Sequence, residues 1–538
     1  MINGADIMVK CLEAEGVSVV FGYPGAAICP FYDSLYNSSI KHVLVRQEQN
    51  AAHAASGYAR CSDIPGVCVA TSGPGATNLI TGIATAYQDS IPIIAITGQV
   101  RSDLLGRDVF QEADITGSAE PFVKHSYLLK NPEDTARVFK EAFYIAGTGR
   151  PGPVLIDIPM DVQKAVIDFE YPEKCEIRSY KPTTKGNYVQ VRRVMAALEE
   201  AEKPLICIGG GVFAAHAENE IRELADLMQI PVITTMMGIS VFPDDDQLFC
   251  GMIGTHGVKM ANAAVNECDV LFLVGARVGD RAVKTPLALE KTTKIIHIDI
   301  DPAEIGKNIG ADLPLVGDAK LVLQQMTELA KPMKHDEWIA HIKTLGGERK
   351  YVEPAKGTVN PRVFIDKLAK KMPANVTVVA DVGQNQIWTC TEYKFRKEGR
   401  LLTSGGMGTM GYSVPAAIGA KMADDSRATV AICGDGAFQM SFMELATAVQ
   451  FGVDIKVVVM TNNRLGMVRE LQTNGYHDRQ TAVFLDGSPD FIKLAEAYGI
   501  PAMRVYDDDT MEKGVEMLAE HKGICLVEVV VDKDMPTL

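Results

Sequence analysis

The chain has 538 residues, of which 47% are hydrophobic and 22% are charged, and this length is more than one hydrophobic core supports. Its net charge of −15, without a basic cluster, argues against nucleic acid or an anionic membrane as a partner. Asp6 and Glu13 interrupt the start where a signal peptide would be apolar, and the eleven cysteines form no C-x-x-C pair. We therefore expect a cytoplasmic globular protein with reduced thiols.

Two stretches of the chain have the composition of linkers. Residues 163–189 and 333–360 are rich in charged residues, proline and glycine, whereas the flanking segments alternate apolar runs with helical patterns. We therefore predict three domains, at residues 1–162, 190–332 and 361–538.

The first predicted domain contains a strand, a turn, a helix and a second strand in close succession. Residues 66–99 read GVCVATSGPGATNLITGIATAYQDSIPIIAITGQ, in which two apolar runs flank a Gly-Pro-Gly turn and an amphipathic segment. The apolar face of that segment has helical spacing and comprises Leu79, Ile80, Ile83, Ala84 and Tyr87. Such a unit predicts parallel strands joined by a crossover helix.

The middle predicted domain has four apolar runs that each end in glycine or a small polar residue. They read PLICIGGG, PVITTMMG, DVLFLVGARV and KIIHIDID, and they predict another parallel sheet with a ligand-binding edge. The GGG at 209–211 is a weak nucleotide signal, because close helix packing also requires glycine. It does not match the dinucleotide pattern G-x-G-x-x-G.

The third predicted domain repeats this plan. RATVAIC (427–433) predicts a buried strand, GDG (434–436) a sharp turn and DIKVVVMT (454–461) a second strand. Between them, Ser441 and Glu444 form an S-x-x-E pattern that predicts a helix start. The predicted apolar face of this helix comprises Phe442, Leu445, Ala446 and Val449. The predicted fold class is thus α/β, with three doubly wound parallel-sheet domains.

Asp435 and Asn462 directly follow these two strands. Because the carboxyl ends of parallel strands meet at one edge of a sheet, we expect the two side chains to lie together. Their oxygens suit a Mg²⁺ ion that also binds phosphate, and the start of a helix provides free N–H groups. Taken alone, either motif is more often an ordinary turn of an α/β protein. The ten histidines show no H-E-x-x-H spacing, so a zinc site has little support.

The spacing of the two motifs is more specific than either motif alone. Twenty-five residues, 437–461, separate GDG from the NN pair at 462–463. This pattern resembles the signature of thiamine-diphosphate enzymes. The resemblance implies that the side chains of Asp435 and Asn462 and the main-chain carbonyl of Arg464 hold the metal.

The resemblance extends over nearly the whole chain. The sequence resembles the pyruvate-oxidase-like thiamine enzymes, and most closely the catalytic (large) subunits of the acetohydroxyacid (acetolactate) synthase family. The matching segments are GYPGAA (22–27), RQEQNAAHAASGYAR (46–60), TSGPGATN (71–78), TGQV (97–100), FQEADITG (110–117), GRPGPV (149–154), GMIGTHG (251–257), GARVGDR (275–281), GMGTMGYSVPAAIGA (406–420) and NNRLGMV (462–468). The implied reaction decarboxylates pyruvate and joins the product to a second 2-keto acid.

The resemblance assigns the first chemical step to Glu48. Its carboxyl group would bond a pyrimidine nitrogen of the cofactor and so promote removal of the thiazolium proton. Without its neighbours, Glu48 would be an ordinary first-turn helix glutamate. Met410 matches the bulky residue that supports the bent cofactor, although methionine is more often a plain core residue. The further implied cofactor-binding residues are Tyr23, Pro24, Gly25, Pro74, Asn78, Gln384, Asn385, Gly408, Gly434, Gly436, Ala437 and Met467.

Four residues match those that line the second-substrate pocket of the family. Arg281 would bind the carboxylate of the second keto acid, a role that suits a planar and always charged group. Phe110, Gln111 and Lys124 would line the pocket and its entrance, and a solvated surface position is the alternative for Lys124. Leu471 stands where the family usually has tryptophan, so we expect a less discriminating pocket with acetolactate as the main product.

The resemblance also implies FAD in the middle domain, without a net redox role. The matching residues are Arg150, Gly210, Gly211, His256, Gly275, Arg277, Asp299 and Asp318. The family's R-F-D-D-R reads R-V-G-D-R here, so Val278 and Gly279 remove an aromatic ring and a carboxylate. Asn385 replaces a histidine of the family and keeps a hydrogen-bonding group near the diphosphate.

Several alternative functions remain open at this point. Pyruvate oxidase, sulfoacetaldehyde acetyltransferase and 2-keto acid decarboxylase are related thiamine enzymes, and FQEADITG with Arg281 argues against them. Glyoxylate carboligase lacks the glutamate that Glu48 supplies. A nucleotide-binding scaffold without catalysis is disfavoured by Glu48, Asp435 and Asn462 together. The resemblance further implies a homodimer or homotetramer, with a possible small regulatory subunit.

Overall fold

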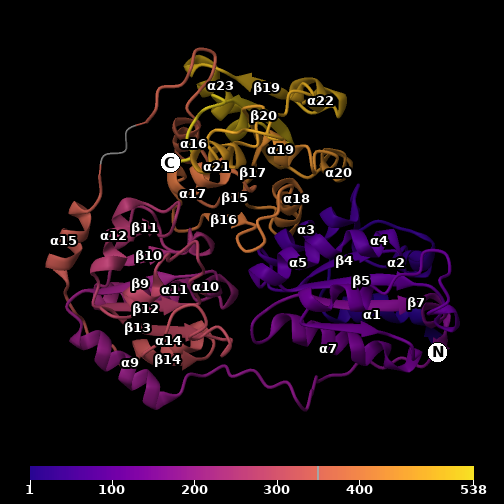
Figure 1. Cartoon of the computed structure of the whole chain (residues 1–538). Helices are drawn as coiled ribbons and strands as arrows, with labels where there is room; N and C mark the ends of the chain where they lie inside the picture. Colours follow the sequence, from indigo (N-terminus) through magenta and orange to yellow (C-terminus); the bar gives the residue numbers. More distant parts are fainter. Residues whose placement is uncertain (348–350) are drawn as a thin grey trace.

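The computed structural model describes residues 1–347 and 351–538. These residues form three lobes, each built around a six-stranded sheet in which neighbouring strands are parallel. In Figure 1 the first domain lies on the right, the middle domain on the left and the third domain above them. The predicted fold class is confirmed.

The first domain has the sheet order β3-β2-β4-β5-β7-β6. Its strands are β2 (Val19–Gly22), β3 (Lys41–Leu44), β4 (Gly66–Ala70), β5 (Ile93–Gln99), β6 (His125–Leu128) and β7 (Val154–Pro159). Its helices are α1 (Gly4–Ala14), α2 (Cys29–Leu35), α3 (Glu48–Ala59), α4 (Pro74–Asn78), α5 (Ile80–Asp89), α6 (Ile115–Ala119), α7 (Thr135–Gly147) and α8 (Met160–Lys164). Apolar residues of α1 and α7 share one core, and those of α3 and α5 share another, so helices cover both faces of the sheet.

The start of the first predicted linker belongs to this domain. Strand β1 (Ile2–Asn3) pairs antiparallel with β8 (Val166–Ile167), which lies inside the stretch 163–189. The chain then runs below the first and middle domains to α9 (Figure 1).

The middle domain has the sheet order β11-β10-β9-β12-β13-β14. Its strands are β9 (Pro204–Ile208), β10 (Val232–Thr234), β11 (Phe249–Met252), β12 (Val270–Val274), β13 (Lys294–Asp299) and β14 (Leu313–Val316). Its helices are α9 (Tyr188–Glu200), α10 (Gly211–Ala214), α11 (Glu218–Met228), α12 (Lys259–Glu267), α13 (Pro286–Leu289) and α14 (Ala319–Thr327). The four predicted apolar runs correspond to β9, β10, β12 and β13, and the short edge strands β11 and β14 complete the sheet.

A helix lies inside the second predicted linker. Helix α15 (Asp336–Thr344) buries Trp338 and Ile342 against a core of the middle domain. Residues 348–350 of that predicted linker lie outside the described residues. The predicted stretch 333–360 therefore contains a structured part that packs on the middle domain.

The third domain has the sheet order β16-β15-β17-β18-β20-β19. Its strands are β15 (Thr377–Ala380), β16 (Arg400–Thr403), β17 (Thr429–Gly434), β18 (Lys456–Thr461), β19 (Ala502–Val505) and β20 (Cys525–Val530). Its helices are α16 (Pro361–Lys371), α17 (Gln384–Glu392), α18 (Ser413–Ala423), α19 (Asp435–Phe438), α20 (Glu444–Phe451), α21 (Gly466–Gly475), α22 (Phe491–Ala497) and α23 (Asp508–Glu520).

The predicted cap of α20 is wrong. The helix begins at Glu444 after Met443, without a side-chain capping bond, and Glu444 is buried. The Glu444 carboxylate accepts hydrogen bonds from the Arg46 N–H and the Asn50 side chain, each at 2.9 Å. The predicted apolar face is only partly right, because Leu445 is buried but Val449 is 45% exposed. Glu444 points toward the first domain, so this helix buries a polar contact between domains.

Helices α3 and α18 join the first and third domains through close backbone contact (Figure 1). A Cβ atom on Gly57 would overlap the Ala416 carbonyl oxygen, and one on Gly419 would overlap that of Ala54. Small residues therefore let the two helix backbones touch. The Tyr412 hydroxyl, next to α18, lies 3.1 Å from the Ser56 hydroxyl of α3.

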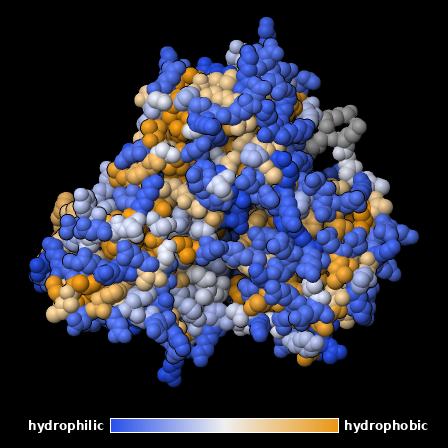
Figure 2. Space-filling model, turned by 180° about the vertical axis from the view of Figure 1, so that it is seen from behind, coloured by the Kyte–Doolittle hydropathy of each residue, from blue (hydrophilic) through white to orange (hydrophobic). Residues whose placement is uncertain are grey.

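One face of the molecule is mainly hydrophilic. Figure 2 shows polar residues over most of one face, with smaller hydrophobic patches on each lobe. None of the helices in the described ranges combines the length and the apolar composition that crossing a membrane requires.

Candidate functional site

Asp435 and Asn462 meet at the carboxyl edge of the third sheet, as predicted. Strands β17 and β18 are parallel neighbours, with Gly434 opposite Met460, so both chains leave the sheet at the same edge. The Asp435 Oδ2 atom accepts the N–H groups of Asn462 at 3.1 Å and Asn463 at 2.6 Å. Its Oδ1 atom accepts the Gly436 N–H at 2.9 Å.

The environment of Asp435 favours a bound cation. The residue is only 2% exposed, and burial raises the pKa of its carboxyl group to about 6, against the lowering effect of the three backbone N–H groups. Burial penalises the charged form, whereas a nearby positive charge would stabilise it. A cation at this carboxylate would therefore offset the penalty of burial.

Neutral oxygens accompany this carboxylate. The Asn462 Oδ1 atom accepts the Arg464 N–H at 3.1 Å, and its Nδ2 atom donates to Gln384 Oε1 at 3.2 Å. The described residues contain no group of three His, Cys, Asp or Glu side chains arranged to hold a metal. One carboxylate with amide and carbonyl oxygens instead suits Mg²⁺, which keeps water and phosphate oxygens as further ligands.

The predicted diphosphate-binding residues surround this edge. Asn385 is fixed by hydrogen bonds from Nδ2 to the Asp381 carbonyl at 2.8 Å and the Ile432 carbonyl at 3.2 Å. Gly408 has a φ of +67° and faces open space. A Cβ atom on Gly436 would lie 3.5 Å from the Met410 Cε atom, so Met410 is beside the GDG turn. The structure thus groups Gln384, Asn385, Met410, Gly434, Asp435, Gly436, Ala437 and Asn462, and Met467 follows on α21.

The loop that carries Met410 is held by a buried aspartate that the sequence analysis missed. Asp381 accepts the N–H groups of Gly411 at 3.0 Å and Ser413 at 2.9 Å. Burial raises the pKa of its carboxyl group to about 6, and these N–H groups lower it. Its place directly after the apolar strand TVVA, at the carboxyl edge of the sheet, is the sequence signal that could have identified it.

Glu48 lies in a second cluster, at the carboxyl edge of the first sheet. It is the first residue of α3, and its Oε2 atom accepts a hydrogen bond from Asn78 Nδ2 at 2.9 Å. A Cβ atom on Gly75 would lie 3.3 Å from Glu48 Oε1, so this oxygen faces the Gly-Pro-Gly turn. The other predicted residues of this edge follow strands β2 and β4, and Tyr23, Pro24 and Pro74 are exposed while Gly25 packs on Thr71.

The two clusters have separate bonding partners. Asn78, the bonding partner of Glu48, belongs to the first domain, and the hydrogen-bond partners of Asp435 belong to the third. That the two clusters are halves of one cofactor site stays a prediction.

The predicted second-substrate residues lie on the surface or in loops. Phe110 is 85% exposed, and the Arg281 side chain is 81% exposed beside Asp280. Gln111 has a φ of +59° and lies against Gly73 of the Gly-Pro-Gly turn. No hydrogen bond or ion pair among the described residues joins Arg281 to Phe110 or Gln111, so their shared pocket stays a prediction.

Lys124 is not a solvated surface residue. Its ammonium group donates to the carbonyls of Ile145 and Thr148, the latter at 2.7 Å, and to the Tyr180 hydroxyl at 3.0 Å. Burial, with the nearby charge of Arg150, lowers its pKa to about 8. These contacts tie the end of α7 to the linker, and a role at the pocket entrance stays a prediction.

The predicted FAD residues lie around the carboxyl edge of the middle sheet. They follow or end successive strands: Gly210 and Gly211 after β9, His256 after β11, Gly275 and Arg277 after β12, Asp299 at the end of β13 and Asp318 after β14. Arg150 reaches this edge from the first domain and contacts Glu304 at 2.7 Å and Asp301 at 3.4 Å.

This middle edge retains buried polar groups that a ligand could satisfy. Within the described residues, both ring nitrogens of His297 and the Glu304 Oε2 atom are buried without a hydrogen-bond partner. Burial also raises the pKa of the Asp299 carboxyl group to about 6. Gly211 lies against the backbone of Gly275, so close packing alone accounts for that glycine. The remaining groups can form hydrogen bonds with a polar ligand.

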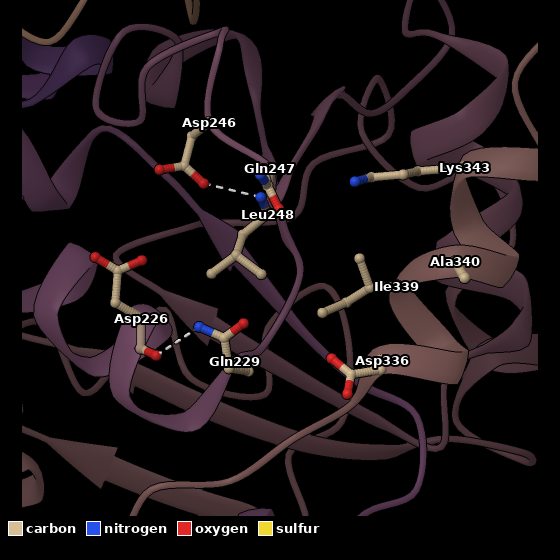
Figure 3. Close-up of a pocket in the computed structure, with 9 residues that line it drawn as sticks. All are labelled: Asp226, Gln229, Asp246, Gln247, Leu248, Asp336, Ile339, Ala340 and Lys343. Carbon is tan, nitrogen blue, oxygen red and sulfur yellow. Dashed lines mark hydrogen bonds between the residues drawn. The ribbon is translucent and has the colours of Figure 1, made fainter.

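A separate surface cavity of about 470 Å³ lies in the middle domain. It is bounded by the end of α11, the segment 246–248 and α15, and Figure 3 shows three carboxylates and Lys343 around it. Its lining comprises Asp226, Gln229, Asp246, Gln247, Leu248, Asp336, Ile339, Ala340 and Lys343. None of these is a predicted site residue.

Comparison with protein families identifies the class. Models of thiamine pyrophosphate enzymes match in three parts: the N-terminal TPP binding domain at residues 2–118, the central domain at 191–326 and the C-terminal TPP binding domain at 381–529. Thiamine pyrophosphate is another name for thiamine diphosphate. The chain therefore belongs to the thiamine pyrophosphate enzymes.

Comparison with curated proteins identifies the family of the chain within this class. A "Probable acetolactate synthase large subunit" of Methanocaldococcus jannaschii is 45% identical over 99% of this chain and 92% of its own length. The acetolactate synthase large subunit of Corynebacterium glutamicum is 44% identical over 94% and 82%, respectively. The isozyme 3 large subunit of Escherichia coli is 40% identical over 99% and 95%. The chain therefore belongs to the acetolactate synthase family.

Proposed function

We propose that the chain is the catalytic subunit of an acetolactate synthase. It decarboxylates pyruvate and joins the remaining two-carbon unit to a second 2-keto acid, the first common step of branched-chain amino acid biosynthesis. Pyruvate gives 2-acetolactate, and 2-ketobutyrate gives 2-aceto-2-hydroxybutyrate. The observation that carries this proposal is the meeting of Asp435 and Asn462 at one sheet edge, in a chain similar to acetolactate synthases along nearly its full length.

Thiamine diphosphate and Mg²⁺ are the proposed cofactors of the third domain. Asp435, Asn462 and the Arg464 carbonyl would hold the metal, and Gln384, Asn385 and the turn at Gly434 and Gly436 would surround the diphosphate. When bound, thiamine diphosphate supplies a carbon nucleophile and accepts the electrons that decarboxylation releases. The fixed N–H groups around Asp435 keep its carboxylate in place for the metal.

With the cofactor bound, Glu48 would take part in the proton transfer of the first step through a carboxylate oxygen. Asn78 donates to Oε2, which leaves Oε1 facing the Gly-Pro-Gly turn and free to exchange a proton with the pyrimidine. Met410 would support the bound cofactor from the third domain, and Asp381 fixes the loop that carries Met410.

Arg281, Phe110, Gln111 and Lys124 are the proposed residues of the second-substrate pocket. The guanidinium of Arg281 is free of a buried partner in the described chain and can form a bidentate pair with a keto-acid carboxylate. Phe110 offers an exposed aromatic surface for the apolar part of the substrate.

We further propose FAD in the middle domain and an assembly of at least two copies. The unpartnered groups of His297 and Glu304 support a polar ligand there. The exposed edge that holds Glu48 and the separate edge that holds Asp435 support a homodimer or homotetramer in which copies complete each other's sites. A small regulatory subunit is a further proposed partner because relatives carry the name large subunit. We also propose a cytoplasmic location.

The proposed function is tested by proton NMR of the purified protein with pyruvate, Mg²⁺, thiamine diphosphate and FAD. Formation of acetolactate that depends on thiamine diphosphate is the expected result. Acetaldehyde as the main product, or acetyl phosphate when phosphate and oxygen are supplied, would instead indicate a related decarboxylase or oxidase. Omitting FAD in a parallel sample tests the flavin separately.

A further inference from the structure

The segment Asp534–Thr537 packs against three helices of the third domain, α16, α17 and α21. The end of the chain lies beside α16, α17 and α21 in Figure 1. Met535 and Thr537 are buried, and Thr537 is only 4% exposed. The segment is therefore packed into the domain, and its polar groups contact specific partners.

Thr537 forms hydrogen bonds with three helices. Its N–H donates to Glu470 Oε1 of α21 at 2.7 Å, and its hydroxyl donates to Glu470 Oε2. Its hydroxyl oxygen accepts from Gln384 Nε2 of α17 at 3.2 Å, and its carbonyl accepts from the Arg362 guanidinium of α16 at 2.6 Å. A single residue thus links α16, α17 and α21.

Neighbouring contacts reinforce this link. Gln384 Nε2 also donates to the Met535 carbonyl at 2.9 Å, and the Trp388 indole N–H donates to the Pro536 carbonyl at 3.1 Å. Arg469 of α21 pairs with Asp534 at 3.3 Å. The bonds to Glu470 and from Arg362 involve charged groups, which makes them stronger than neutral hydrogen bonds.

Two of the three linked helices, α17 and α21, carry residues that bear on the proposed cofactor site and on the choice of the second substrate. Gln384 begins α17, and its Oε1 atom accepts from the proposed metal ligand Asn462 at 3.2 Å. Glu470 of α21 directly precedes Leu471, the residue expected to influence the choice of the second keto acid. A movement of α21 at Glu470 would therefore shift Leu471 relative to the diphosphate edge.

We propose that Thr537 and Glu470 are positioning residues that fix α21 against α17 and so set the selectivity for the second keto acid. This inference rests on the proposed carboligase function. Neither residue is assigned a contact with substrate or cofactor. Both act through the placement of Leu471 on α21.

The test uses the full-length protein with four variants. Thr537→Val keeps the shape but removes the hydroxyl, and Thr537→Ser keeps the hydroxyl. Glu470→Gln keeps one acceptor for the Thr537 N–H but replaces the oxygen that accepts the hydroxyl hydrogen. Thr429→Val is the matched control, because the Thr429 hydroxyl is buried without a partner in the described structure and lies at the opposite end of the same domain.

Each protein receives an equimolar mixture of pyruvate and 2-ketobutyrate, and NMR measures the ratio of acetohydroxybutyrate to acetolactate. We expect Thr537→Val and Glu470→Gln to change this ratio roughly threefold to tenfold, through loss of a charged hydrogen bond. Thr537→Ser and Thr429→Val should keep the wild-type ratio. Binding of thiamine diphosphate, measured by calorimetry, should stay within about twofold of wild type in all four variants.

Two results would overturn the inference. One is an unchanged product ratio in Thr537→Val and Glu470→Gln, including the case in which total turnover falls, since a merely structural role predicts that outcome. The other is an equal change of the ratio in Thr429→Val. Failure of the proposed function is seen separately in the wild-type sample, which would then form neither product, and the inference would fall with it.

Discussion

One oxygen of Asp435, Oδ2, accepts the backbone N–H groups of both Asn462 and Asn463, at 3.1 and 2.6 Å. The carboxylate is therefore held by the main chain of the neighbouring strand end and is oriented before any ligand binds. Preorganised charge of this kind favours a cation that needs strict geometry, such as Mg²⁺.

Asp435→Asn should weaken the Mg²⁺-dependent binding of thiamine diphosphate by at least about tenfold, because it removes the charge and places an amide where two N–H donors converge. Calorimetric titration with and without Mg²⁺ measures the effect. Asp454→Asn is the control, because Asp454 precedes β18 and lies at the opposite edge of the same sheet. An unchanged dependence on Mg²⁺ would exclude Asp435 as the metal ligand.

Glu48→Gln should slow exchange of the thiazolium proton of bound thiamine diphosphate by about 10²–10⁴-fold. The amide oxygen of the substituted side chain can still accept a hydrogen bond from Asn78 Nδ2. The amide cannot, however, exchange the proton that the first step requires. Binding of metal and diphosphate should stay intact, because those contacts lie at the other sheet edge. Proton–deuterium exchange followed by NMR measures the rate, with the exposed Glu133→Gln as the control. Unchanged exchange would remove Glu48 from the mechanism.

Leu471→Trp should increase the proportion of acetohydroxybutyrate when pyruvate and 2-ketobutyrate compete. Leu471 is largely exposed on α21, so a larger aromatic ring can add apolar contact to the extra methylene group of 2-ketobutyrate without disturbing a packed core. Contact with one extra methylene group contributes about 1–3 kcal/mol of discrimination between substrates. We therefore expect the ratio of acetohydroxybutyrate to acetolactate to change roughly tenfold or more. A strong preference of the wild-type protein for 2-ketobutyrate would contradict the expectation that Leu471 gives a less discriminating pocket.

Asp157 should make the stability of the first domain depend on pH. Burial raises the pKa of its carboxyl group from 3.8 to about 7, against hydrogen bonds from Thr97 and Gln99 that lower it. The folded chain therefore binds this proton more tightly than the unfolded chain, and the free energy of unfolding falls as the pH rises from about 4 to about 7.

Asp157→Asn removes this titration. The stability of the variant relative to wild type should rise between pH 4 and 7 by at most about 4 kcal/mol and then level off. Thermal melts across that range measure the difference, and the exposed Asp33→Asn should show no such trend. A constant difference between Asp157→Asn and wild type would contradict the raised pKa.

Local patterns predicted the fold class and the proximity of Asp435 and Asn462. The GDG turn and the NN pair each follow an apolar strand, and parallel pairing then determines that Asp435 and Asn462 share an edge. Local patterns did not identify Glu48 and Asn78 as site residues, because only the resemblance to thiamine enzymes indicated them. Their contact joins residues that follow different strands.

Contacts between distant segments explain what the sequence did not predict. Glu444 matched a local capping pattern, yet it bonds Arg46 and Asn50, nearly four hundred positions away in the chain. Asp381 binds the main chain of the Met410 loop, and Thr537 links three helices, so neither role leaves a periodic pattern in the sequence. The domain limits and most of the proposed ligand contacts stay predictions.

The backbone contact between α3 and α18 limits which sequences this architecture tolerates. At Gly57 and Gly419 the obstacle to a larger residue is the carbonyl of the facing helix, which cannot change rotamer to make room. A methyl group at either position would therefore separate the first and third domains as whole bodies. The residues that can replace Gly57 and Gly419 without unfolding the chain therefore indicate how far apart the first and third domains can move.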